Sequence, residues 1–166
     1  MSRYLTPLRC VFLLCALVAS CESVTEVVAH DTYSASLSGA AVRPDTVETS
    51  GTGSFHITLA SDTSVATYDL SFSGLSDVAT SAHLHGPAQD TVAAGVLVDF
   101  AALPDGAAGT LQLGTSGQAN GTIDLAKPVT AGVSGDSLKR LIIAGLLYVD
   151  VHTSAHSPEI RGQIKR

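Results

Sequence analysis

Apolar and polar residues alternate along most of the chain from Tyr33 onward. In SVATYDLSFSG (64–74), the residues Ala66, Tyr68, Leu70 and Phe72 fall on one side of an extended strand and polar residues on the other. Gly, Pro, Asp, Ser and Asn, which are typical of turns, separate further runs of this kind. These runs are YSASLSG, GSFHITLA, SAHLHG, AGVLVDF, GTLQLG, GTIDLA, LLYVDVHT and EIRGQI. The pattern predicts eight or nine short strands in a two-sheet sandwich or a closed barrel. The residues predicted to be buried are Leu37, Ala66, Tyr68, Leu70, Phe72, Leu84, Val96, Val98, Ile123, Val149, Val151 and Ile160.

One segment has the spacing of a helix instead. In SGDSLKRLIIAGL (134–146), apolar residues recur at three- and four-residue intervals, Asp136 or Ser137 can cap the start, and Gly145 can end the helix. We therefore predict a single short helix near residues 136–144. The rest of the domain is rich in Thr, Val and Ser, which favour strands over helices.

The N-terminal segment predicts export. MSRYLTPLR has two Arg and no acid, and the apolar run that follows, CVFLLCALVAS, is far shorter than the ~20 residues of a membrane-spanning helix. VASC (18–21) resembles a bacterial lipobox, in which cleavage leaves Cys21 as the first residue and acyl chains are attached to it. The predicted organisation is a lipoprotein signal peptide at 1–20, an acylated Cys21 with its tether at 21–31, and one domain at 32–166.

A lipid anchor on Cys21 predicts a protein of the bacterial cell envelope, bound to a membrane through palmitate-type chains. Glu22, and not Asp, follows this cysteine, and by resemblance to Gram-negative lipoproteins this favours the outer membrane. All 15 Asp and Glu residues follow Cys21, whereas Arg3 and Arg9 precede it, so the exported part has a net charge of −8 with His neutral. This acidity argues against a nucleic-acid partner and against electrostatic adhesion to anionic lipid.

The cysteine positions exclude further chemistry. Cys10 and Cys15 lie in the signal peptide and Cys21 would carry lipid, so the folded domain has no thiol for catalysis or for a zinc site. The sequence also has no Gly-x-Ser-x-Gly, His-Glu-x-x-His or phosphate-loop motif. We therefore expect a non-enzymatic protein with no catalytic residues and no required cofactor.

Three strands carry an unusually polar face opposite their apolar face. In each strand, residues two apart share a side. If these strands are neighbours, their polar faces form one cluster. Its candidate members are His83, His85, Asp150, His152, Glu159 and Arg161.

The segments that hold these residues resemble the CHRD domain, a module repeated in chordin and found singly in many exported bacterial proteins. The resemblance covers essentially the whole exported part. It is carried by YSASLSGAAVRP, TSGTGSFHITL, ATYDLSFSGLSDVATSAHLHGPA and IIAGLLYVDVHTSAHSPEIRGQI. It implies an all-β, immunoglobulin-like antiparallel β-sandwich or barrel, and it implies no established reaction. Asp150 stands where the family usually has Asn, and the turn SAHSP lacks the Gly usually found before Glu159.

Three interpretations of the polar residues remain open. In the first, the histidines form a hydrogen-bonded network that joins strands in a structural or binding module. In the second, neutral imidazoles of His83, His85 and His152, with Asp150, bind copper or zinc. In the third, the His-x-His pattern is similar to copper-zinc superoxide dismutase, but the further ligands of that enzyme are not found at its spacings.

Overall fold

The computed structural model describes residues 30–60, 64–130 and 132–166. The alternating runs are strands, as predicted, and most of the described chain is antiparallel β-sheet. The strands are β1 (His30–Ser38), β2 (Thr52–Ala60), β3 (Val65–Ser73), β4 (Ala79–His85), β5 (Val96–Asp99), β6 (Ala107–Gln112), β7 (Gly117–Asp124), β8 (Pro128–Thr130), β9 (Val133–Ser134), β10 (Tyr148–Thr153) and β11 (Ile160–Gln163).

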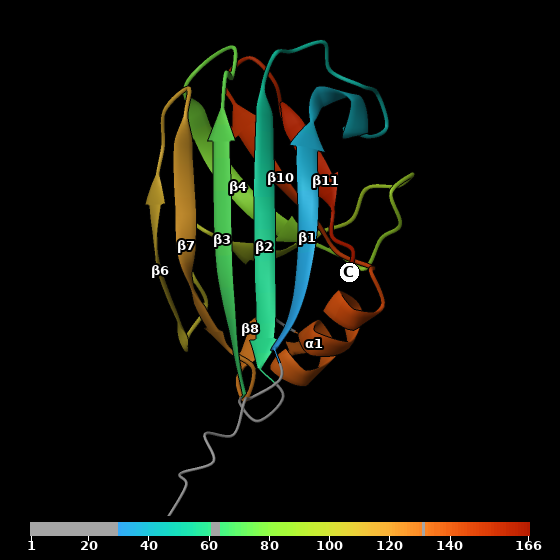
Figure 1. Cartoon of the computed structure of the whole chain (residues 1–166), viewed down its shortest axis with the longest axis vertical. Helices are drawn as coiled ribbons and strands as arrows, with labels where there is room; N and C mark the ends of the chain where they lie inside the picture. Colours follow the sequence, from blue (N-terminus) through green and yellow to red (C-terminus); the bar gives the residue numbers. More distant parts are fainter. Residues whose placement is uncertain (1–29, 61–63, 131) are drawn as a thin grey trace, which may run out of the picture.

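Nine of these strands form one curled sheet in the order β5-β4-β10-β11-β1-β2-β3-β7-β6, and β8 and β9 form a separate pair. In Figure 1, β1, β2, β3, β7 and β6 make a front layer, and β4, β10 and β11 cross behind it. The apolar faces of the two layers enclose a single core that includes Phe55, Leu70, Leu84 and Ile160. This architecture confirms the predicted all-β sandwich or barrel.

The predicted core is confirmed with one exception. Of the residues expected inside, Val96 on β5 is 46% exposed, whereas its neighbours Leu97 and Val98 are both buried. The pairing of β4 with β5 shifts register between Leu84 and His85. Such a bulge breaks the two-residue alternation, so the parity of AGVLVDF gave the wrong side for Val96. The confirmed core residues are Leu37, Ala66, Tyr68, Leu70, Phe72, Leu84, Val98, Ile123, Val149, Val151 and Ile160.

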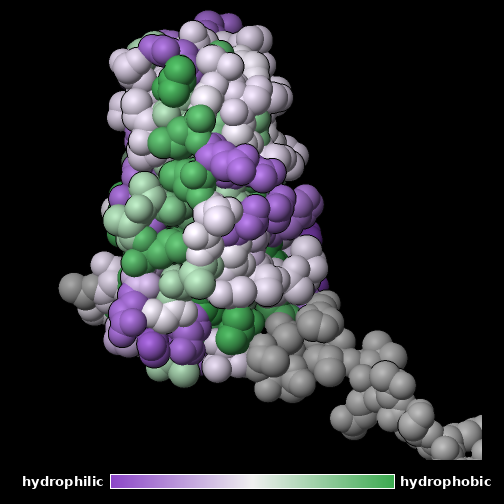
Figure 2. Space-filling view, turned by 90° about the vertical axis from the view of Figure 1, so that its left-hand side faces the viewer, coloured by the Kyte–Doolittle hydropathy of each residue, from purple (hydrophilic) through white to green (hydrophobic). Residues whose placement is uncertain are grey.

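At the other edge of the sheet, β6 lies along the left side of Figure 1, and Figure 2 views the molecule from that side. Apolar and polar side chains lie next to one another on this surface (Figure 2). Leu111 on β6 packs against the core, whereas Leu113 just beyond the strand is 45% exposed. Single exposed apolar residues of this kind are common on soluble proteins and define no site.

The predicted helix is α1 (Gly135–Ile143), with Leu138 and Ile142 buried against the core. Its N-cap is Ser134, and not Asp136 or Ser137, because the Ser134 hydroxyl accepts a hydrogen bond from the Ser137 amide at 3.1 Å. Gly145 follows the helix with a φ of +67°, the left-handed conformation that commonly ends helices. Within the described part of the chain, no helix has the length and apolar character needed to cross a membrane.

The N-terminal predictions fall mostly outside the described residues. The signal peptide at 1–20, Cys21 and the tether up to residue 29 are not described, so their assignments stay predictions. Strand β1 includes His30 and Asp31, which the sequence analysis assigned to the tether, and both residues pair with β2.

Candidate metal site

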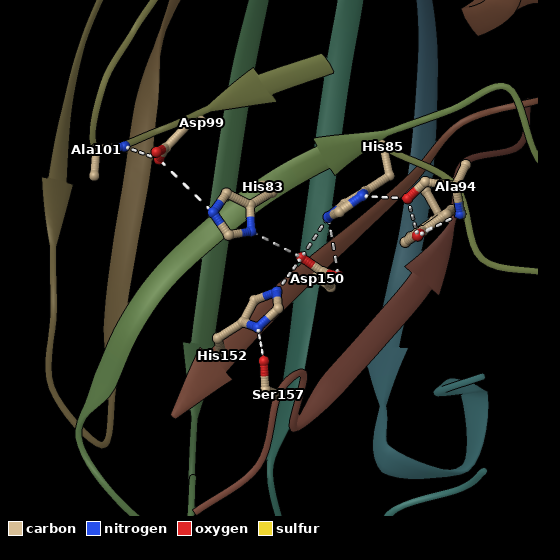
Figure 3. A network of polar contacts seen from close by, with 9 residues as sticks. His83, His85, Ala94, Asp99, Ala101, Asp150, His152 and Ser157 are labelled. Carbon is tan, nitrogen blue, oxygen red and sulfur yellow. Dashed lines mark hydrogen bonds and ion pairs between the residues drawn. The ribbon is translucent and has the colours of Figure 1, made fainter. Parts of the chain in front are cut away.

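Pairing of β4 with β10 brings the candidate histidines together. The register places His83 opposite Asp150 and His85 opposite Tyr148, although these residues are far apart in the sequence. Residues two apart on each strand share a face, so His83 and His85 from β4 meet Asp150 and His152 from β10. Figure 3 shows the three imidazole rings arranged around the Asp150 carboxylate.

The Asp150 carboxylate is the centre of this histidine cluster, defined as His83, His85, Asp150 and His152. Its side chain is 3% exposed. Its oxygens lie 3.1 Å and 3.2 Å from Nε2 of His85, and Oδ1 lies 3.2 Å from Nε2 of His152. Nδ1 of His83 lies 3.6 Å from Oδ1, which is too long for a hydrogen bond. One ligand atom from each of the four residues falls within 4.8 Å of the others.

On its outer side, each ring also has a polar neighbour, which is a hydrogen-bond partner for His85 and His152 and a more distant carboxylate for His83. Nδ1 of His85 lies 3.0 Å from the carbonyl oxygen of Ala94, and Nδ1 of His152 lies 2.9 Å from the hydroxyl of Ser157. Nε2 of His83 lies 3.9 Å from Oδ1 of Asp99 (Figure 3). Metal-binding histidines characteristically use their second nitrogen in this way, since such a contact fixes the orientation of the ring.

The charges of the cluster follow from this geometry. Burial alone would raise the pKa of Asp150, but the surrounding imidazoles, and the charge of His85, hold it far below its usual range. Burial alone would lower the pKa of His85, but the hydrogen bond and charge of Asp150 and the Ala94 carbonyl raise it above its usual value. Nδ1 of His85 faces the carbonyl oxygen of Ala94, and Nε2 faces the carboxylate of Asp150, so both ring nitrogens face hydrogen-bond acceptors. This arrangement requires either a protonated imidazole or a cation between the ring and the carboxylate.

The spacing suits a small metal ion. Zinc bonds to nitrogen and oxygen at about 2.0–2.2 Å, so neighbouring ligands of a tetrahedral site are roughly 3.3–3.6 Å apart. The separations between the Asp150 oxygens and the histidine nitrogens, 3.1 to 3.6 Å, cover that interval. The side chains of His83 and His152 are 15% and 17% exposed, so the cluster is open to solvent on their side.

Two further residues support the cluster from behind. The Tyr148 ring stacks on His85 with centroids 4.7 Å apart and an angle of 3° between planes, and its hydroxyl bonds to the backbone of Ala94. The Arg161 guanidinium lies 3.7 Å from the centroid of the same ring. Tyr148 is two residues before Asp150 on β10, and the sequence analysis did not include it in the cluster. The sequence analysis did not include Ala94, Asp99 and Ser157, because the alternation along β4 and β10 does not show which residues of other segments lie next to these two strands.

The expectation that Glu159 lies in this cluster is wrong. Glu159 is buried, and its carboxylate accepts hydrogen bonds from Thr49, Ser76 and Thr153. Glu159 precedes the first residue of β11, so strand parity did not apply to it. Arg161 pairs in register with Asp150 but contacts Tyr148 and the loop after β4.

The remaining histidines lie elsewhere. His56 on β2 is exposed, and His156 contacts Thr153 through its backbone. His30 starts β1. Among the residues that the structure describes, the only group of ligating side chains suited to a metal ion is the histidine cluster.

The antiparallel fold and the two paired histidine segments are the features by which the family of this all-β domain is identified. The CHRD domain model matches residues 33–164, and the chain belongs to the CHRD domain family. Neither the comparison with curated proteins nor the comparison with solved structures gave a match.

Proposed function

We propose that this protein is a non-catalytic module of the bacterial cell envelope that binds one copper or zinc ion. The ligands are His83, His85, Asp150 and His152. The observation that carries the proposal is the convergence of three imidazoles on one buried carboxylate, with all four ligand atoms within 4.8 Å. Three nitrogens and one oxygen suit copper or zinc better than calcium or magnesium, which prefer oxygen ligands. CHRD domains are not a known catalytic family.

The contacts of the rings favour metal binding over a purely structural network. A network without metal would place hydrogen bonds on each buried nitrogen, yet Nδ1 of His83 has no hydrogen-bond partner among the described residues. A neutral His83 coordinating through Nδ1 would use that lone pair. The outer contacts of His85 and His152 would then hold their rings ready for the ion.

A thermal and calorimetric titration tests the proposal. Zinc or copper added to chelator-treated protein should bind at one ion per chain and raise the melting temperature. At about a hundredfold excess over Kd, the ion should add about 2.7 kcal/mol to the free energy of unfolding. His85→Ala and His152→Ala should lose this response. His56→Ala is the matched control, because His56 is exposed on β2, and its response should equal that of the wild type.

The structural alternative gives a different result in the same titration. In that case His85→Ala lowers the melting temperature, but neither metal nor chelator shifts the wild type. An unshifted wild type would therefore contradict metal binding and leave a hydrogen-bonded network as the role of the cluster.

The location of the protein is a separate part of the proposal and rests on VASC (18–21). Several acyl chains anchor a protein stably, since each buried CH₂ contributes about 0.8 kcal/mol. Cys21→Ala should move the protein from the membrane fraction to the soluble periplasmic or secreted fraction, as measured by fractionation and immunoblotting. Ser20→Ala is a control that retains the cysteine and a small residue before it. A Cys21→Ala protein that stays in the membrane fraction would exclude the lipid anchor.

A further inference from the structure

A polar pocket lies beside Arg161, whose guanidinium contacts the Tyr148 ring. Its volume is about 390 Å³. It is formed by residues from β1, from η1 (Gly39–Ala41) and the segment that follows η1, from the loop after β4, from β11 and from the C-terminal segment. Its lining residues are Ser36, Ser38, Ala40, Ala41, Arg43, Asp90, Arg161, Gln163 and Lys165.

The pocket collects positive charge on an acidic protein. The chain has a net charge of −6, yet the lining holds three cations and one carboxylate. That carboxylate, Asp90, lies 3.5 Å from Lys165. Among the described residues, Arg43 donates only to the backbone oxygens of Ala40 and Val42. Neither Arg43 nor Arg161 makes an ion pair with a carboxylate within the described ranges, so the two arginines give this pocket an unbalanced positive charge.

Arg161 is the unusual member of the lining, because its side chain is almost fully buried without an acidic partner. The residue is 2% exposed. Its Nη2 donates to the carbonyl oxygens of Gln89 and Val92 at 3.2 Å and 2.8 Å. Its Nη1 has no hydrogen-bond partner among the described residues. The guanidinium carbon of Arg161 lies 3.7 Å from the centroid of the Tyr148 ring. A guanidinium that stacks on an aromatic ring can still donate hydrogen bonds from the N–H groups in its own plane.

A second unpartnered atom indicates what else a ligand should carry. Nε2 of Gln163 donates to the carbonyl oxygens of Ala88 and Gly145, both at 2.8 Å. Its Oε1 is buried and has no donor within the described part of the chain. A hydroxyl group would supply that donor, and the hydroxyls of Ser36 and Ser38 line the same space.

We propose that this pocket binds a small hydroxylated organic anion, with its carboxylate or phosphate group held by Arg161 and Arg43. Guanidinium groups bind these planar or tetrahedral oxyanions through paired, charge-assisted hydrogen bonds. Ligand hydroxyls donate to Gln163 and exchange hydrogen bonds with Ser36 and Ser38. Seven of the nine lining residues are polar or charged, and only Ala40 and Ala41 are apolar. The pocket therefore accommodates a sugar acid, a hydroxy acid or a sugar phosphate in preference to an acyl chain.

The binding experiment uses the purified Cys21→Ala chain after treatment with chelator, so that no anion can bind through a metal ion. Isothermal titration calorimetry with gluconate and glucose 6-phosphate should show saturable binding of at least one of them at one site per chain, and neutral glucose should not bind. Arg43→Gln should weaken binding roughly ten- to hundredfold, the cost of losing a charged hydrogen-bond donor. Arg140→Gln is the matched control, because Arg140 is an exposed helical residue paired with Asp136.

Two outcomes would overturn the proposal. One is the absence of saturable binding by both anions. The other is binding that Arg43→Gln leaves unchanged. A further arm uses phosphatidylglycerol vesicles, whose headgroup offers the same phosphate and hydroxyl chemistry on a surface. Vesicle binding that needs Arg43, without binding of either soluble anion, would assign the pocket to a lipid headgroup and reject a free ligand. Because no metal is present, the result is independent of the proposed metal site.

Discussion

Replacing Asp150 with Ala should lower the free energy of unfolding of the metal-free protein by about 3 kcal/mol. The carboxylate is the common partner of His85 and His152, and it is almost fully buried. Its removal leaves both Nε2 atoms without this acceptor, and it removes the charge that stabilises protonated His85. Chemical denaturation at neutral pH in the presence of chelator measures the effect. Asp69→Ala on the exposed face of β3 is the control and should change stability little.

Asp150→Asn separates the charge of this residue from its shape. Asn is the residue usual at this position in the family that the sequence resembles, and its amide oxygen can still accept one hydrogen bond. The variant should therefore be more stable than Asp150→Ala. It should nevertheless bind zinc or copper at least about tenfold more weakly than the wild type, because a neutral amide is a poorer ligand than a carboxylate. If Asp150→Ala were as stable as Asp69→Ala, the contacts around Asp150 would contribute nothing to folding.

The sequence predicted which side of a strand each residue lies on better than it predicted which strands lie next to one another. Alternation put His83 and His85 on one side of β4 and Asp150 and His152 on one side of β10. It could not show that the two strands pair, because His85 and Asp150 are 65 residues apart and alternation is a local property. Partners supplied by loops, such as the Ala94 carbonyl, have no pattern at all. The cluster was therefore predictable as a set of candidates and not as a geometry.

Errors arose where the chain departs from a regular strand. The bulge between β4 and β5 exposed Val96, and the start of β11 at Ile160 left Glu159 outside the parity of EIRGQI. Both departures depend on tertiary pairing, which local alternation does not encode. The residue before a strand can point toward loops from other parts of the chain. Glu159 does so, and after the replacement of Asp150, the loss of its contacts is the second substitution for which we expect a large decrease in the free energy of unfolding.

Glu159 joins three separate segments through one buried carboxylate. It accepts hydrogen bonds from Thr49 Oγ1 at 2.5 Å, from the backbone N and Oγ of Ser76 at 2.7 and 2.9 Å, and from Thr153 Oγ1 at 2.9 Å. Glu159→Gln has nearly the same size, but its NH₂ group would face donors and it carries no charge. We expect a loss of about 2–4 kcal/mol in the free energy of unfolding, because buried donors lose their acceptor. The matched control is Glu48→Gln, because Glu48 directly precedes Thr49 and its side chain is exposed.

The same contacts predict how the stability of the domain depends on pH. Burial alone would raise the pKa of Glu159, but the hydrogen bonds from Thr49, Ser76 and Thr153 lower it below the ordinary value of 4.5. The unfolded chain therefore takes up a proton at this residue before the folded chain does. The stabilisation that Glu159 gives is fully present above pH 4.5 and is lost as the pH falls below that value. Urea unfolding of chelator-treated protein between neutral pH and pH 3 should show a steeper loss in the wild type than in Glu159→Gln. Parallel curves for the two proteins would mean that this carboxylate has the same pKa in the folded and unfolded chains.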